Sequence, residues 1–333
     1  MKGKMADSHI IGVEHLVKNY GDLRAVDDVS FSVDQGEIFG LLGPNGAGKT
    51  TTISILCTLT KPTSGGASIN GFDIVRQQSQ VRQCIGLVFQ DPSLDDRLTA
   101  LENMDFHARV YNVPASVRKE RIEQVLKMVE LWERRRDIVK TFSGGMKRRL
   151  EIARGLIHRP KVLFLDEPTL GLDPQTRHRL WDFILGLRET EGTTVFLTTH
   201  YMDEAEYASR IAVMDHGQLI ALDSPVGLKG MVGGDVISLS TVDDQKARAE
   251  LQVRYKIEPR YDNGQLSFEI ADGDRFIPTL IKQLKTEILS ISLRRPTLDD
   301  VFLKLTGRGL RDETVKSEMK EMVRRFGRYQ RRH

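Results

Sequence analysis

A glycine-rich segment at residues 43–50 constrains the fold of this chain more than any other part of the sequence. It reads Gly-Pro-Asn-Gly-Ala-Gly-Lys-Thr and continues the nearly unbroken apolar run of residues 37–42. Glycine lets the backbone turn tightly, so that successive N–H groups point inward at a phosphate, and the following helix N-terminus adds its dipole. A strand, a phosphate-binding loop and a helix are therefore predicted here, in preference to an ordinary glycine-rich turn.

The side chains of this loop predict a nucleotide site. Lys49 is expected to reach the β- and γ-phosphates, and the Thr50 hydroxyl is expected to ligate Mg²⁺. The predicted nucleotide-binding residues of this segment are Gly43, Pro44, Asn45, Gly46, Ala47, Gly48, Lys49, Thr50 and Thr51.

Two acidic residues follow a second apolar run, at residues 162–165. Asp166 is placed to hold Mg²⁺ directly or through water, and Glu167 is the candidate general base for an attacking water. Taken alone, the pair could equally cap the turn before Pro168. Beside a phosphate loop, the hydrolytic interpretation is favoured.

Three further residues gain their significance from position. Gln90 follows a predicted strand, so its amide oxygen could approach Mg²⁺ and the attacking water. His200 also ends a strand and is a candidate for contact with the γ-phosphate. Tyr20 could stack on adenine, an interaction worth about 1–3 kcal/mol in related settings. Each of the three, taken in isolation, is more often a surface or packing residue.

The run Ser143-Gly144-Gly145-Met146 opens a helix that has no phosphate loop beside it. The free N–H groups of such a turn need a nucleotide from elsewhere, most simply from a second copy of the chain. Ser143, Gly144 and Gly145 are therefore predicted to bind the nucleotide held by that second copy.

Composition and charge restrict the class of protein. The chain has 333 residues and a formal charge of +3, which is too small to imply nucleic acid as a partner. Cys57 and Cys84 lack metal-ligand spacing and are expected to be buried small hydrophobes. No apolar run approaches the ~20 residues that span a bilayer, and the N-terminus lacks the apolar core of a signal peptide. We therefore expect a cytoplasmic chain, and any membrane part that works with it must be another polypeptide.

The hydrophobic pattern predicts an α/β fold in several parts. Residues 10–35 alternate as in antiparallel strands, whereas residues 98–158 are helical and include a capping box at Thr99 and Glu102. Glycines near residue 230 precede a small α+β region. The predicted parts are an N-terminal extension (1–9), a nucleotide-binding domain (10–228) with a helical insertion (about 98–158), a small C-terminal α+β domain (229–310) and a basic amphipathic tail (311–333).

The order of these motifs resembles that of the ATP-binding subunits of ABC (ATP-binding cassette) transporters. It matches, in turn, the adenine-stacking aromatic, Walker A, Q-loop, signature, Walker B, D-loop and H-loop of that family. The residues concerned are Tyr20, the loop at 43–50, Gln90, Ser143 to Gly145, Asp166 with Glu167, Asp173 and His200.

This resemblance implies a RecA-like P-loop core with an antiparallel β-subdomain and an α-helical insertion. It also implies ATP and Mg²⁺ as cofactors, Glu167 and His200 as catalytic residues, and Thr50, Gln90 and Asp166 as metal ligands. Two copies would pack head to tail around two ATP molecules. Their closure would drive a membrane partner from the cytoplasmic face of the cell membrane.

The signature departs from the commonest form, Leu-Ser-Gly-Gly-Gln, because Phe142 and Met146 replace its Leu and Gln. The surrounding run and the segment 295–303 look like daunorubicin/doxorubicin-resistance exporters of the ABC-2 class, which carry a similar small C-terminal domain. This similarity implies efflux of a drug-like or hydrophobic compound through a separate ABC-2-type membrane subunit.

Two alternatives stay open at this point. One is a soluble ABC ATPase that acts on ribosomes or DNA. The single phosphate loop, and the lack of room for a long coiled coil between Lys49 and Ser143, argue against it. The other is export of lipid or polysaccharide.

Overall fold

The protein is described here by a computed structural model that covers residues 9–90, 93–262 and 264–307. The chain divides into two compact units, with a boundary between Leu222 and Asp223. Of the predicted N-terminal extension only His9 is described, as the first residue of a strand, and the predicted tail 311–333 lies outside the described residues. In the part of the chain that is described, no helix is long and apolar enough to cross a membrane.

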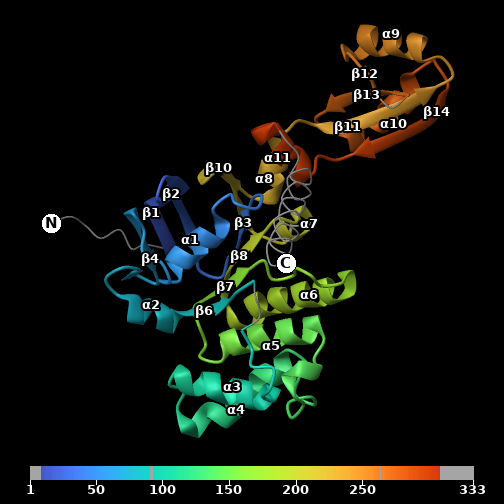
Figure 1. The fold of residues 1–333 in the computed structure, drawn as a ribbon. Helices are drawn as coiled ribbons and strands as arrows, with labels where there is room; N and C mark the ends of the chain where they lie inside the picture. The colour runs from blue at the N-terminus through green and yellow to red at the C-terminus, as the bar shows by residue number, and fades with distance from the viewer. Residues whose placement is uncertain (1–8, 91–92, 263, 308–333) are drawn as a thin grey trace, which may run out of the picture. The chain divides into compact units, whose positions relative to one another are not determined.

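A six-stranded sheet forms the centre of the first unit (Figure 1), in the order β10-β9-β3-β8-β7-β6. The pairs β3–β8, β3–β9, β7–β8 and β6–β7 are parallel. Parallel strands are buried on both faces, which explains the continuous apolar runs in β3 and β7. The strands are β3 (Ile38–Leu42), β6 (Ile85–Val88), β7 (Val162–Asp166), β8 (Thr194–Thr199), β9 (Arg210–Asp215) and β10 (Gln218–Asp223).

An antiparallel sheet of order β2-β1-β4-β5 packs against this centre. Its hydrophobic face and the helix α1 (Lys49–Leu56) share one core with β3, β7 and β8. The ring of Phe31 stacks on Phe39 at 5.2 Å between centroids, and Phe39 stacks on Phe196 at 5.3 Å, so aromatic contacts join the two sheets. The strands are β1 (His9–Tyr20), β2 (Leu23–Asp34), β4 (Ser64–Ile69) and β5 (Phe72–Asp73), and α2 (Gln78–Cys84) leads into β6.

The helical insertion contains α3 (Ala100–Val110), α4 (Ala115–Met128), the short 3₁₀ helix η1 (Val139–Thr141) and α5 (Gly144–Leu156). The predicted capping box is confirmed, because the Thr99 hydroxyl accepts from the Glu102 N–H and the Glu102 carboxylate accepts from the Thr99 N–H. Helices α6 (Pro174–Glu191) and α7 (Met202–Ala205) complete the unit. Helix α5 also packs on β6, where Gly86 and Gly155 allow the two backbones to approach closely.

The second unit is a four-stranded antiparallel sheet of order β12-β13-β11-β14 with helices α9 and α10 on its apolar face. This βαββαβ arrangement is the ferredoxin-like, split βαβ topology, which is more specific than the α+β class predicted from the sequence. Its elements are α8 (Pro225–Gly230), β11 (Asp235–Thr241), α9 (Asp244–Tyr255), β12 (Arg260–Asp262), β13 (Gln265–Ile270), α10 (Gly273–Gln283), β14 (Ile288–Arg294) and α11 (Leu298–Thr306).

The boundary between the units lies a few residues earlier than the predicted position near residue 228. Helix α8 packs on α11, and Lys304 Nζ of α11 donates to the carbonyls of Met231 and Val232 just after α8. These contacts assign α8 to the second unit. They join residues some 70 positions apart in sequence, so local sequence patterns could not predict that α8 belongs to the second unit.

Candidate active site

The phosphate loop lies between β3 and α1 and requires glycine for steric reasons. Gly48 has a φ of 107° and Gly46 a φ of 84°, both in the left-handed region. A Cβ atom on Gly43 would lie 2.2 Å from the carbonyl oxygen of Met214, and one on Gly48 would lie 2.4 Å from that of Ala25. The loop is therefore held tightly between β2 and the end of β9.

Lys49 is almost fully buried, with 4% of its side chain exposed. Its ammonium donates to the carbonyls of Gly43 at 2.8 Å and Pro44 at 3.1 Å, and so curls back over the loop. Burial lowers the pKa of Lys49, although the nearby Glu167 and Asp166 carboxylates oppose the shift. The cation is thus held where an anionic group would compensate it.

Asp166 ends β7 beside the first turn of α1. The Thr50 hydroxyl donates to Asp166 Oδ1 at 3.4 Å, and the Thr198 hydroxyl of β8 donates to the same oxygen. Burial raises the pKa of Asp166 in spite of these two bonds. A cation here would stabilise the ionised carboxylate.

Glu167 occupies a left-handed backbone conformation, with φ of 46°. Its N–H donates to the Thr198 carbonyl and hydroxyl, at 3.2 Å and 3.0 Å. Its Oε1 lies 3.7 Å from Lys49 Nζ and 3.2 Å from His200 Nδ1. The His200 contact is a close approach without hydrogen-bond alignment, since no acceptor is aligned with that buried nitrogen. Burial would raise the pKa of Glu167, but His200 and Lys49 outweigh it and the pKa is lowered.

The residues present fit a nucleotide with Mg²⁺. Within residues 9–90, 93–262 and 264–307, no group of three or more His, Cys, Asp or Glu could hold a metal by itself. A site with one carboxylate and one hydroxyl suits Mg²⁺, which keeps several waters and takes phosphate oxygens as ligands. The inward-turned loop, the buried Lys49 and the Asp166–Thr50 pair supply that chemistry.

Gln90 and Tyr20 occupy more open positions. Gln90 is exposed and follows β6, whose Val88 pairs with Leu165 just before Asp166, so it emerges at the same sheet edge as the two acidic residues. Tyr20 is 49% exposed at the end of the β1–β2 hairpin, and Lys18 Nζ lies 4.9 Å from its ring centroid. Tyr20 is not among the buried residues of the hydrophobic core of the first unit.

The Ser143–Gly145 turn belongs to a different place in the fold. Ser143 caps α5, where its hydroxyl accepts from the Met146 N–H at 3.3 Å. A Cβ on Gly145 would lie 2.2 Å from Thr176 Cγ2, and the atom nearest to one on Gly144 belongs to Leu172. The turn therefore packs against the start of α6, and the residues around it differ from those around the phosphate loop.

Several buried polar residues at the sheet edge were not predicted from the sequence. Glu204 of α7 is 1% exposed and accepts from the hydroxyls of Thr169 and Thr199, next to His200. Arg148 and Glu151 of α5 are also buried behind Asp166 and Glu167. In the sequence these residues look like the solvated faces of helices, so only their spacing of three residues could have drawn attention to the pair on α5.

Comparison with known proteins agrees with this geometry. A sequence model of the ABC transporter family matches residues 26–170. A daunorubicin resistance ATP-binding protein of Streptomyces coeruleorubidus is 39% identical over 328 residues, which cover 95% of this chain and 99% of that protein. A Nod factor export ATP-binding protein of Ralstonia nicotianae is 40% identical and covers 91% of this chain and 95% of its own.

Two solved structures resemble a large part of this chain. The cbiO1 protein of Clostridium perfringens, part of an ABC transporter complex, aligns with a TM-score of 0.63 at 27% identity over 75% of this chain and 97% of that one. A dimeric ATP-binding cassette bound to ADP and Pi aligns with a TM-score of 0.59 at 29% identity, covering 64% and 98%.

The fold and the site together define a P-loop nucleotide hydrolase. More specifically, the chain belongs to the ABC transporter family, as an ATP-binding and ATP-hydrolysing subunit. The resemblance noted from the sequence is thereby confirmed.

Proposed function

We propose that the chain powers an exporter by hydrolysing ATP at the sheet edge formed by Lys49, Asp166, Glu167 and His200. The observation that carries this proposal is the position of Glu167, whose carboxylate lies between two cationic or polar nitrogens and is kept ionised. An ionised carboxylate at this point can accept a proton from water as the water attacks the γ-phosphorus. The bond from that phosphorus to the bridging oxygen then breaks, which yields ADP and phosphate.

The other residues bind and orient the reactants. The loop at 43–50 and Lys49 hold phosphate oxygens, and Tyr20 offers its exposed ring to adenine. Thr50 and Asp166, with Gln90, would hold Mg²⁺, which when bound neutralises developing charge on the phosphates. His200 touches Glu167 and is close enough to orient it and a γ-phosphate together.

A second copy of the chain completes the site. The Ser143–Gly145 turn begins α5, where the first N–H groups of a helix have no carbonyl partner within the helix, at a place separate from the phosphate loop of its own chain. Two chains packed head to tail would bring each turn to the other chain's nucleotide. A similar cassette is dimeric in its solved structure, which supports this arrangement.

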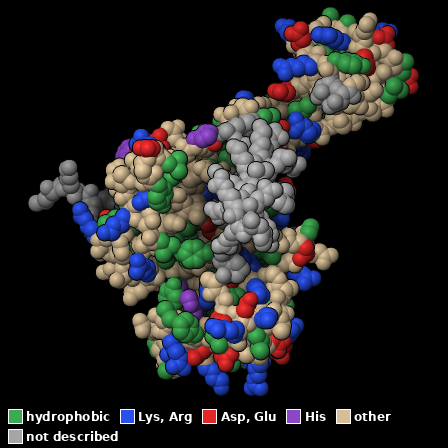
Figure 2. Space-filling view, viewed as in Figure 1, with side chains coloured by type: hydrophobic (Ala, Val, Ile, Leu, Met, Phe, Trp, Pro, Cys, Tyr) green, Lys and Arg blue, Asp and Glu red, His purple; other side chains and the backbone are tan. Residues whose placement is uncertain are grey.

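The membrane partner would be an ABC-2-type subunit, with this chain on its cytoplasmic face. An open groove of about 1090 Å³ next to Gln90 suits an apolar segment of such a partner, since Leu59, Phe89, Phe106 and Val110 line it with exposed side chains. Figure 2 shows hydrophobic side chains gathered between α2 and α3, where this groove lies. Because this groove lies next to Gln90, a movement of the bound partner segment would be coupled to Gln90 and so to the nucleotide.

Efflux of a drug-like or hydrophobic compound is the cargo class we favour, because several relatives are named for drug resistance. A daunorubicin resistance protein and a linearmycin resistance protein of Bacillus subtilis both match nearly the whole chain. A second class of cargo is also tested, because the Ralstonia relative is named for Nod factor export. Accumulation of daunorubicin in cells with and without the chain and its membrane partner separates the two classes.

The proposal is tested with Glu167→Gln, which keeps the shape of the side chain but removes its basicity. We expect this variant to bind ATP, lose hydrolysis and persist as an ATP-bound dimer on size-exclusion chromatography. Lys49→Ala should instead lose ATP affinity and remain monomeric. Vigorous hydrolysis by the Glu167→Gln variant would remove Glu167 as the base.

A further inference from the structure

Three charged side chains on one face of α5 are buried against the hydrolytic edge. Arg148, Glu151 and Arg154 follow one another at intervals of three residues and are 7%, 1% and 8% exposed. Buried charges in proteins are paired or bonded to polar groups, because their desolvation is costly. The acceptors and donors that surround these three residues therefore indicate what they hold in place.

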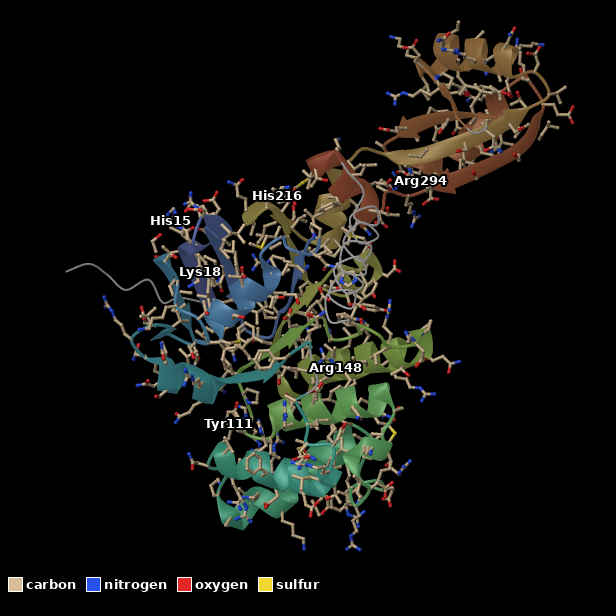
Figure 3. The ribbon with its side chains drawn as sticks, viewed as in Figure 1. His15, Lys18, Tyr111, Arg148, His216 and Arg294 are labelled. Carbon is tan, nitrogen blue, oxygen red and sulfur yellow. The ribbon has the colours of Figure 1, made fainter. Side chains whose placement is uncertain are left out.

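Arg148 uses all five of its N–H donors. Its Nε donates to the Pro168 carbonyl at 2.7 Å, and Nη2 donates to the carbonyls of Asp166 at 3.0 Å and Glu167 at 3.2 Å. Nη1 donates to the Phe89 carbonyl and, at 3.2 Å, to Glu151 Oε2. Figure 3 shows Arg148 directed from α5 toward the sheet.

Glu151 and Arg154 extend this contact past Gln90. The second carboxylate oxygen of Glu151 accepts from the Ser93 N–H at 2.8 Å, and Arg154 donates to the Ser93 carbonyl at 2.7 Å and to its hydroxyl. Phe89 precedes Gln90 and Ser93 follows it. One face of α5 thus binds the chain on both sides of Gln90 and also the backbone around Glu167.

The carbonyls that Arg148 binds belong to the last residue of β7, to the two residues after it, and to Phe89 just after β6. Beyond Asp166 the chain turns away from β7, and Glu167 takes a left-handed conformation that a residue with a Cβ adopts at a cost in free energy. Three successive carbonyl oxygens, of residues 166 to 168, converge on one guanidinium. A planar fork with five donors meets this demand, whereas a lysine ammonium has three donors and a different shape.

We propose that Arg148, fixed by Glu151, is a positioning residue for ATP hydrolysis. It holds the backbone of Asp166–Pro168 and the residue after β6, Phe89, so that the Glu167 carboxylate stays close to the Lys49 ammonium. Arg148 touches no reacting atom and acts through Glu167. The proposal rests on the proposed role of Glu167 as the base.

The test compares Arg148→Lys with Arg121→Lys in the full-length chain. Arg121 is a matched control because it is 6% exposed, donates to the carbonyls of Leu156 and Ile157 at the far end of α5, and lies 3.8 Å from Glu191. Both changes keep the positive charge but remove the planar guanidinium group from a buried site. Steady-state hydrolysis of Mg-ATP, giving kcat and KM separately, and binding of a fluorescent ATP analogue are measured for each.

We expect Arg148→Lys to lower kcat by about 10²-fold, the usual effect of a misplacement near 1 Å, with affinity for the analogue unchanged. A Glu167 carboxylate that drifts from Lys49 and His200 is no longer held where it can take a proton from the attacking water, so hydrolysis falls while nucleotide binding does not. Arg121→Lys should leave both kcat and affinity unchanged.

Equal kcat values for the two variants would overturn the proposal. So would a parallel loss of kcat and nucleotide affinity in Arg148→Lys, because that pattern indicates general damage to the site. If Arg148→Lys does not fold, Glu151→Gln replaces it: the amide weakens the hold on Arg148, and unchanged kcat would again refute the role.

The Glu167→Gln variant separates the two proposals. If it is inactive while Arg148→Lys hydrolyses normally, only the positioning role of Arg148 fails. If Glu167→Gln hydrolyses ATP as the wild type does, Glu167 is not the base and Arg148 has no positioning role through it.

Discussion

Glu167 shows how a single residue can be costly for the fold and useful for the reaction. A non-glycine residue in the left-handed region costs on the order of 1–3 kcal/mol, and here the neighbouring contacts must supply that free energy. The hydroxyl and carbonyl of Thr198 bind its N–H, and Arg148 binds its carbonyl. The carboxylate is thereby directed back over the sheet edge toward Lys49.

His107 of α3 gives a test of buried electrostatics at the residue scale. Burial, with the charges of Arg154 and His158, lowers the pKa of His107 to about 4. An unfolded chain takes up a proton on this residue near pH 6.5, and the folded chain does so only near 4. The folded state therefore loses stability as pH falls from about 6.5 to about 4, by about 1–2 kcal/mol after discounting for partial exposure.

Urea unfolding of His107→Gln at pH 7.5 and pH 4.5 measures this effect. The variant should lose less stability than the wild type between these two pH values. His178→Gln serves as the control, because the His178 side chain is 70% exposed. An identical pH dependence in His107→Gln and wild type would contradict the argument.

At the scale of single residues, the sequence identifies functional residues that follow strands more readily than functional residues that lie within helices. Asp166, Glu167 and His200 each stand at or just after the end of a strand, and parallel strands bring such positions to one edge of a sheet. Lys49 begins α1, but the glycine-rich motif that precedes it marks its position in the sequence. Arg148 and Glu204 lie on helices among other charged residues, where no local pattern distinguishes a buried charge from a solvated one. Their partners are carbonyls and hydroxyls far away in sequence.

Helix α5 links two parts of the site at the scale of secondary-structure elements. It begins at the Ser143 turn, carries Arg148 at its middle and ends where Gly155 approaches β6. A shift of this helix along its axis would move the turn, the Glu167 backbone and the Gln90 flanks together. The three buried charges of α5 bind the backbone around Glu167 and beside Gln90, and so couple the helix to both parts of the site.

The close approach of α5 and β6 leads to a paired prediction. A Cβ on Gly86 would lie 2.3 Å from the Gly155 carbonyl oxygen, so Gly86→Ala should destabilise the chain by about 1–3 kcal/mol, as overpacking does. Gly186 lies inside α6 with no atom near its Cβ position, so Gly186→Ala should stabilise by about 0.5–1 kcal/mol. Thermal unfolding of the two variants checks the opposite signs, and equal melting temperatures would refute the packing argument.

Long periodic elements were predictable, and short or irregular ones were not. The strands at 10–35, the insertion helices and the capping box at Thr99 follow from hydrophobic spacing and end signals. The segment 64–84, which forms β4, β5 and α2, is rich in Gly, Ser and Gln and has little periodicity. The position of α8 likewise depends on its packing against α11, which lies at the other end of the second unit.

At the scale of the whole molecule, each unit has a hydrophobic core of its own. The core of the second unit includes Ile237, Leu239, Leu251, Leu266 and Phe268, all nearly inaccessible to solvent. A domain with its own core can fold alone. The nucleotide site described above is built entirely from residues of the first unit.

Separate expression tests this division. A fragment of residues 1–224 should bind a fluorescent ATP analogue with the affinity of the full chain. A fragment of residues 223–307 should show dispersed amide resonances and a cooperative thermal transition. Failure of the first fragment to bind nucleotide would show that the site depends on the second unit.

The separation of the Ser143 turn from the phosphate loop has a genetic consequence. In the proposed dimer, a damaged loop and a damaged turn carried by different alleles fall together in one site and leave the other site wholly intact. Two such alleles would complement each other in one cell, although each alone is null. Two alleles damaged in the same motif would not, because every dimer would then carry a defect in both sites.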